Sequence, residues 1–187
     1  MITELTGLDV SNASLLDEAS SASEAMFMAY NVHNGKRNKF FLSSSVFPQN
    51  IEVIKTKADG LGIELVIDDP ANFDWSKANE FCGYLVQNPD NFGTVHDITE
   101  VAARLKEHKV VVTIIADILS LTLIKPPGEM GADIAVGSAQ RFGVPMCFGG
   151  PHAGYMAVKD ELKRKMPGRL IGVSKDVHGN KSYRMSL

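Results

Sequence analysis

A chain of 187 residues can bury one substantial hydrophobic core, and its 44% hydrophobic and 22% charged residues exclude a wholly disordered protein. The net charge of −3 excludes the basic surface of a typical nucleic-acid binder, and no apolar run is long enough to span a membrane. The first residues lack the basic-then-apolar pattern of a signal peptide, so we expect a cytoplasmic protein, or a mitochondrial-matrix protein in a eukaryote. Cys82 and Cys147 lie in apolar contexts and are expected to be buried free thiols, and no histidine or cysteine spacing predicts a metal site.

The first predicted element is a helix over residues 12–32, where apolar residues recur at helical spacing and Gly35 follows the end. Ser20, Ser21 and Ser23 are unusual inside a helix, because serine hydroxyls compete for backbone hydrogen bonds. The helix proper is therefore expected to start nearer Ser20, after a loop.

Strands and helices alternate after this helix. Apolar and β-branched runs predict strands at residues 39–45, 63–69, 81–89, 110–116, 132–138 and 154–159. Helices are predicted at residues 49–61 and 97–108, the second capped by Thr94 or Asp97. The continuous β-branched run at 110–116 is typical of a strand buried on both faces. This alternation predicts one α/β domain over residues 1–187, a three-layer α/β/α sandwich with a mainly parallel sheet.

Ligands of such sheets bind beyond the carboxyl ends of the strands. Asp117 ends the run VVVTIIAD, so its carboxylate could face a ligand there, or it could cap the segment ILSLTLIK that follows. The stretch LLDEASSAS could seat a phosphate at a helix start, or it could be a serine-rich helix entrance without a ligand.

The turn FGGPHAG, residues 148–154, is a second candidate ligand loop. The amides of Gly149 and Gly150 could approach an anion closely, but the turn matches neither the dinucleotide-binding GxGxxG pattern nor the phosphate loop of nucleotide-binding proteins. His152 could act as an acid or a base, and a histidine hydrogen-bonded within a turn explains the pattern equally well.

Four stretches in order carry a family resemblance: LTGLDVSNASLLDEASSASEAM, VQNPDNFG, KPPGEMGADIAVGSAQRFGVPM and FGGPHAGYMAVKDELKRKMPGRLIGVSKD. Together they closely resemble the N-terminal half of the glycine cleavage system P-protein family, over almost the whole chain. The resemblance implies the large domain of a fold type I pyridoxal-phosphate enzyme. It also implies a chain that lacks a flanking N-terminal segment and the small C-terminal domain.

Members of this family are oxidoreductases with glycine dehydrogenase activity, which serve glycine catabolism. They decarboxylate glycine with pyridoxal 5'-phosphate and pass the aminomethyl group to the lipoyl arm of H-protein. The protein supplies a lysine that bonds to the cofactor, a carboxylate beside the pyridine nitrogen and a cradle for the phosphate. In this family only the C-terminal-type half keeps that lysine, in a motif like N-L-H-K-T-F-x-x-P-H-G-G-G-G-P-G.

The stretch GSAQRFGVPMCFGGPH registers with that motif. Phe142 falls on its phenylalanine, Pro145 on its first proline, and Gln140 on its lysine. Glutamine has no nucleophilic amine, so the resemblance implies a pseudo-active site with no catalytic residue and no covalently bound cofactor in this chain.

The remaining candidates follow from the same resemblance. Asp117 falls where the other half pairs a carboxylate with the pyridine nitrogen, and the serines at 20, 21 and 23 fall where it seats the phosphate. Asp17 and Glu18 stand beside that seat and would repel an anion. We expect the turn that contains Gly149, Gly150 and His152 to face the lysine-bearing half, whose active site it would complete.

Two other interpretations stay open. This half could be a purely structural unit that docks the catalytic partner and H-protein. More weakly, the chain could be an independent nucleotide-binding α/β domain, although it has no recognised phosphate loop.

Overall fold

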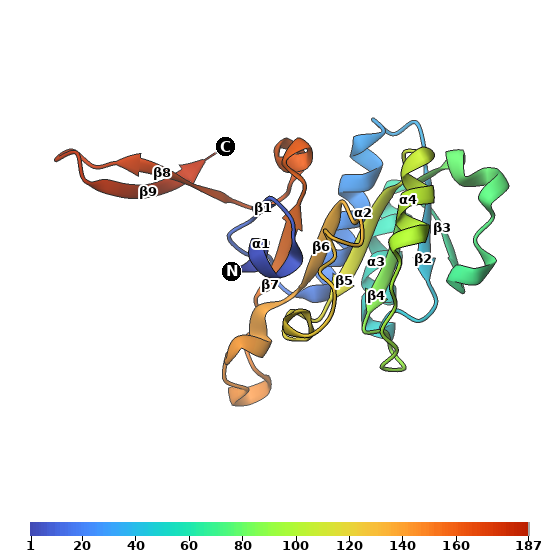
Figure 1. Cartoon of the computed structure of the whole chain (residues 1–187), viewed down its shortest axis with the longest axis horizontal. Coiled ribbons are helices and arrows are strands. Elements are labelled where there is room, and N and C mark those ends of the chain that lie inside the picture. Colours follow the sequence, from blue (N-terminus) through green and yellow to red (C-terminus); the bar gives the residue numbers. More distant parts are fainter. Residues whose placement is uncertain (187) are drawn as a thin grey trace.

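Strands and helices alternate in the computed structural model, which describes residues 1–186, and build a seven-stranded sheet (Figure 1). The strands, in spatial order across the sheet, are β1 (Val10–Ser11), β7 (Gly154–Val158), β6 (Ile134–Ser138), β5 (Val111–Ala116), β4 (Phe81–Asn88), β2 (Lys39–Ser43) and β3 (Glu64–Asp68). The five strands from β6 to β3 are parallel, whereas β7 runs antiparallel to both β6 and β1. The mainly parallel sheet predicted from the sequence is therefore confirmed.

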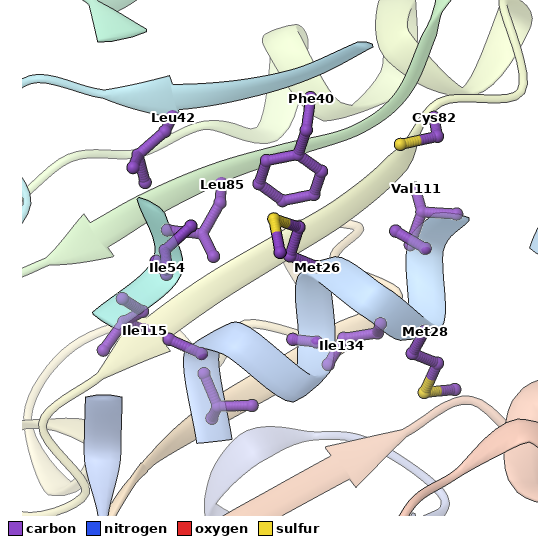
Figure 2. Close-up of a cluster of buried hydrophobic side chains, with 14 of the residues drawn as sticks. Met26, Met28, Phe40, Leu42, Ile54, Cys82, Leu85, Val111, Ile115 and Ile134 are labelled. Atoms are coloured by element: carbon purple, nitrogen blue, oxygen red, sulfur yellow. The ribbon is translucent and has the colours of Figure 1, made fainter. Parts of the chain in front are cut away.

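Helices cover both faces of this sheet and make a three-layer sandwich. The four α-helices are α1 (Ile2–Thr6), α2 (Glu18–Val32), α3 (Pro48–Leu61) and α4 (Thr99–Glu107). Buried side chains of α2 and α3 pack on one face of the sheet, and those of α4 pack on the other. Figure 2 shows the first of these clusters, in which Met26 of α2 and Ile54 of α3 lie over Phe40 of β2 and Leu85 of β4.

Alternate residues of each central strand serve the two cores, because successive side chains of a strand point to opposite faces. Ile115 belongs to the cluster under α2 and α3, whereas its neighbour Ile114 belongs to the cluster under α4. All residues of β5 are buried, as the β-branched run predicts for a strand covered on both sides.

Helix boundaries follow the capping chemistry of the chain. Asp17 accepts a hydrogen bond from the backbone N–H of Ser20 at 2.7 Å, so α2 begins at Glu18, close to the later of the two starts considered. The carboxylate of Asp97 accepts from the N–H of Thr99 at 2.9 Å, which confirms Asp97 rather than Thr94 at the entrance to α4.

Two expectations need correction or addition. Cys82 is a buried free thiol, but Cys147 is exposed, because it lies in a short 3-10 helix (Cys147–Gly149) on a loop that projects from the sheet. The chain after the main sheet forms an antiparallel hairpin of β8 (Leu170–Lys175) and β9 (Lys181–Ser186), which extends away from the domain (Figure 1).

Among residues 1–186, no helix has the length and apolar character needed to cross a membrane.

Candidate functional site

A cleft of about 560 Å³ opens at the carboxyl edge of the parallel strands, where such sheets bind their ligands. The start of α2, the start of α3 and the ends of β4, β5 and β6 supply its walls. Its lining residues are Asp17, Glu18, Ala19, Phe47, Gln49, Asn50, Gln87, Pro89, Asp90, Gly93, Asp117, Ser138, Gln140, Arg141 and His152. The structure thus brings together Asp117, Gln140 and His152, three residues singled out from the sequence.

The most enclosed polar group of the cleft is the carboxylate of Glu18. Its Oε1 accepts hydrogen bonds from Asn50 Nδ2 at 2.7 Å and from Gln87 Nε2 at 3.2 Å. Burial raises the pKa of Glu18, the two amide hydrogen bonds lower it in part, and the nearby carboxylates of Asp117 and Asp17 raise it further. The outcome is a pKa above the ordinary value for glutamate.

The two amides that hold Glu18 are themselves buried. Asn50 is 1% exposed and Gln87 is 3% exposed. Gln87 Oε1 accepts from the backbone N–H of Phe47 at 2.8 Å, so the network also fixes the entrance to α3. Sequence reasoning missed these residues, although a glutamine and an asparagine that close the apolar strand β4 were a usable signal.

The expected phosphate seat at the start of α2 is closed by the chain itself. Asp17 occupies the position of an anion, because its Oδ1 already accepts from the N–H of Ser20. Ser21 Oγ donates to the carbonyl of Asp17 at 2.7 Å, and Ser23 Oγ donates to the carbonyl of Ser20 at 2.8 Å. The structure therefore does not bring the three serine hydroxyls to the cleft.

Asp117 combines the two roles considered from the sequence. Its Oδ1 accepts from the backbone N–H of Leu119 at 3.2 Å, which caps the turn that follows β5. Its Oδ2 lies 3.3 Å from Nη1 of Arg141, across the cleft. Arg141, another residue missed from the sequence, thus neutralises the carboxylate that the resemblance assigns to a pyridine nitrogen.

Gln140 lies in a 3-10 helix (Ala139–Phe142) that directly follows β6, and Ser138 Oγ accepts its backbone N–H at 3.2 Å. Gly150 packs against its side chain, since a Cβ at Gly150 would lie 2.5 Å from Gln140 Nε2. The backbone of Gly150 has φ of 76°, in the region that favours glycine. Gly150 therefore braces the glutamine from outside the cleft, whereas Gly149 is exposed and has open space beside it.

The loop after β4 forms the opposite rim. Asp90 Oδ1 accepts from the N–H groups of Phe92 and Thr94, both at 2.9 Å, and its Oδ2 lies 2.8 Å from Nε2 of His96. These hydrogen bonds lower the pKa of Asp90 against the opposing effect of burial. The rim is thus held in shape by a carboxylate, and within residues 1–186 no cluster of histidine, cysteine and carboxylate residues could hold a metal ion.

The cleft does not fit covalently held pyridoxal phosphate. No lysine lines it, the amide at the start of α2 is taken by Asp17, and Asp117 is paired with Arg141. A phosphate would also meet the buried carboxylate of Glu18.

Comparison with known proteins places this architecture. A family model described as "Glycine cleavage system P-protein" matches residues 1–187. Over 187 residues the chain is 52% identical to a protein of Synechocystis sp. and 54% identical to one of Rhizobium etli, both named "Glycine dehydrogenase (decarboxylating)". Each match covers 100% of this chain and 19% of the relative, so the chain spans a minor part of these relatives.

Solved structures agree with this similarity. The chain resembles a glycine decarboxylase (P-protein) of the glycine cleavage system, crystallised in inhibitor-bound form, with a TM-score of 0.90 and 34% identity over 100% of this chain and 43% of that one. Cystathionine gamma-lyase from Lactobacillus plantarum shares the fold alone, with a TM-score of 0.69 and 16% identity over 88% of this chain and 42% of that one. The fold expected from the sequence, that of a fold type I pyridoxal-phosphate enzyme, is confirmed.

Proposed function

Because the chain belongs to the glycine cleavage system P-protein family, we propose that it is a part of the enzyme that decarboxylates glycine with pyridoxal phosphate and transfers the aminomethyl group to lipoylated H-protein. The match of the family model over residues 1–187 carries this proposal. The activity belongs to a longer protein, since the chain spans 19% of its relatives. The cytoplasmic location expected from the sequence stays a prediction.

Within that enzyme, this segment is the large-domain portion of the half that does not anchor the cofactor. The observation that supports this role is Gln140, which lies in the cleft directly after β6, where the resemblance sets the cofactor-binding lysine. Asp17 and Arg141 support it further, because they occupy the start of α2 and the carboxylate of Asp117. Pyridoxal phosphate then belongs to the lysine-bearing half.

The contribution of this half is to complete the active site of its partner. The loop between β6 and β7 projects from the domain and carries apolar side chains with no cover, Met146 at 75% and Phe148 at 111% exposure. Phe148 also has φ of 51°, a conformation that a non-glycine residue rarely adopts. An apolar loop that ends in the Gly149–His152 turn suits contact with another polypeptide.

Replacement of Gly150 by valine in the full-length enzyme tests this role. The new side chain meets Gln140 Nε2, so the turn must shift and the partner's active site is disturbed. Release of labelled carbon dioxide from carboxyl-labelled glycine should fall at least tenfold, while the bound cofactor, measured by absorbance, stays constant. Gly143→Val is the matched control, because Gly143 also has a positive φ but has open space beside it.

Two results would decide against this role. Wild-type kinetics in Gly150→Val would show that the turn does not reach the partner's site. Loss of H-protein binding with intact decarboxylation would favour the purely structural half, whose crevice tolerates substitution.

A further inference from the structure

The β8–β9 hairpin has one apolar face. Its register pairs Ile171 with Met185 and Val173 with Tyr183, and residues paired directly across two strands point to the same side. Their exposed fractions are 54%, 58%, 68% and 64%, in that order, although all four are large apolar side chains. We call these four residues the apolar face of the hairpin.

The opposite face of the hairpin has a different composition. Gly172 pairs with Arg184, and Ser174 pairs with Ser182, so this side is small or polar. The hairpin forms a sheet of its own and projects away from the main sheet (Figure 1). A two-stranded hairpin in water is marginally stable unless its apolar side packs against something. Within residues 1–186 the apolar face has no such cover, which identifies it as a docking surface.

Positive charges bracket the apolar face at both ends. Lys175 pairs with Lys181 beyond Val173 at the tip, and Arg169 directly precedes β8 at the base. Within the described residues, none of these three side chains forms a salt bridge. The acidic residue of the hairpin, Asp176, is engaged in its turn, where Oδ1 accepts the N–H groups of residues 178 and 180 at 2.8 Å. The surface is therefore an apolar strip with uncompensated cations at each end.

This pattern selects the chemistry of the occupant. Two copies of the hairpin packed face to face would meet like charges in either direction, because both ends are basic. An apolar strip flanked by carboxylates would match both the apolar face and its charges. The crystallised glycine decarboxylase chain has 57% of its length outside the match, since this chain covers 43% of it, so family members have ample further polypeptide to supply such a strip.

We propose that the apolar face of the β8–β9 hairpin docks on the lysine-bearing half of the enzyme, at an apolar surface flanked by acidic side chains. This inference rests on the proposed function, because it takes the partner from there. It adds a second contact, remote in sequence from the loop that carries Phe148, so that the two projecting parts of the domain hold the partner together.

The test measures binding of the 187-residue chain to the separately purified lysine-bearing half by isothermal titration calorimetry. The double variant Val173→Lys, Tyr183→Lys places two charges on the apolar face and should weaken binding at least tenfold. The control Ser174→Lys, Ser182→Lys adds the same charges one pair along the hairpin, on the other face. It should bind within twofold of wild type.

Charge and self-association separate the remaining explanations. Lys175→Glu with Lys181→Glu should weaken binding at low salt, and the difference should shrink as salt is raised. Equal binding by the apolar-face variant and its control would overturn the proposal while leaving the association intact. No binding by the wild-type chain would overturn the association itself. A wild-type dimer in sedimentation velocity that the apolar-face variant abolishes would assign the surface to a second copy.

Discussion

Tyr155→Phe removes the hydrogen bond that ties β7 to the end of β5 beside the cleft. Tyr155 is 3% exposed, and its hydroxyl donates to the carbonyl of Ala116 at 2.8 Å. Gly137 makes room for this contact, since a Cβ there would lie 2.9 Å from the hydroxyl oxygen. Loss of the donor leaves a buried carbonyl without this partner, which costs about 1–3 kcal/mol. For a domain of this size, that lowers Tm by roughly 2–4 °C per kcal/mol.

Tyr84→Phe is the matched control for that substitution. Tyr84 is 1% exposed and packs in the core under α4, but its hydroxyl makes no hydrogen bond within the described residues. Urea unfolding at pH 7, followed by far-UV circular dichroism, gives the free energy of unfolding of both variants. Tyr84→Phe should stay within about 0.5 kcal/mol of wild type. If Tyr155→Phe were no more destabilising than Tyr84→Phe, the reasoning about this hydrogen bond would be refuted.

Alkaline pH gives a second signature of the same residue. Burial raises the pKa of Tyr155 well above its ordinary value of 10.0, so the folded state keeps its proton where the unfolded state loses it. This contribution to stability is full below pH 10 and declines as pH rises above it. Tyr155→Phe should therefore lose less stability than wild type between pH 9 and pH 11.

Two further substitutions probe the start of α2. Glu18→Gln keeps an Oε1 acceptor for Asn50 and Gln87, and the pKa of Glu18 is raised above 4.5. Stability from the proton is lost as pH rises through the folded pKa, so urea unfolding should show the variant more stable than wild type at pH 8, with the difference vanishing below pH 4. Asp17→Ala removes the cap of α2 and should cost about 0.5–2 kcal/mol, whereas Asp17→Ser should restore most of it; equal losses would exclude the cap.

Much of the fold was predictable because its signals are local. The β-branched run of β5 and the alternation of strands with helices indicate a buried parallel sheet without knowledge of any long-range contact. The antiparallel direction of β7 was not predictable, since strand periodicity is the same in either direction. The β8–β9 hairpin was missed as well, because its sequence GVSKDVHGNKSYRM alternates like a half-buried strand although nothing in the described chain covers it.

The site was only partly predictable from the sequence. Asp117 and Gln140 follow directly from strand ends, and the rule that ligands bind at the carboxyl edge was enough to find them. The network around Glu18 was not accessible, because its partners come from two other elements and only side-chain direction unites them. The serines of α2 failed for the same reason: a sequence shows a hydroxyl near a helix start but not that it donates to a carbonyl of its own helix.

Addition of pyridoxal phosphate to the 187-residue chain, followed by borohydride reduction and peptide mass mapping, measures directly whether this half can tether the cofactor. We predict only scattered, substoichiometric labelling of surface lysines, because Gln140 offers no amine inside the cleft, whereas the lysine-bearing half treated in parallel gains one label on one lysine. One-to-one labelling of a single lysine in this chain, with a yellow absorbance band before reduction, would contradict the assignment.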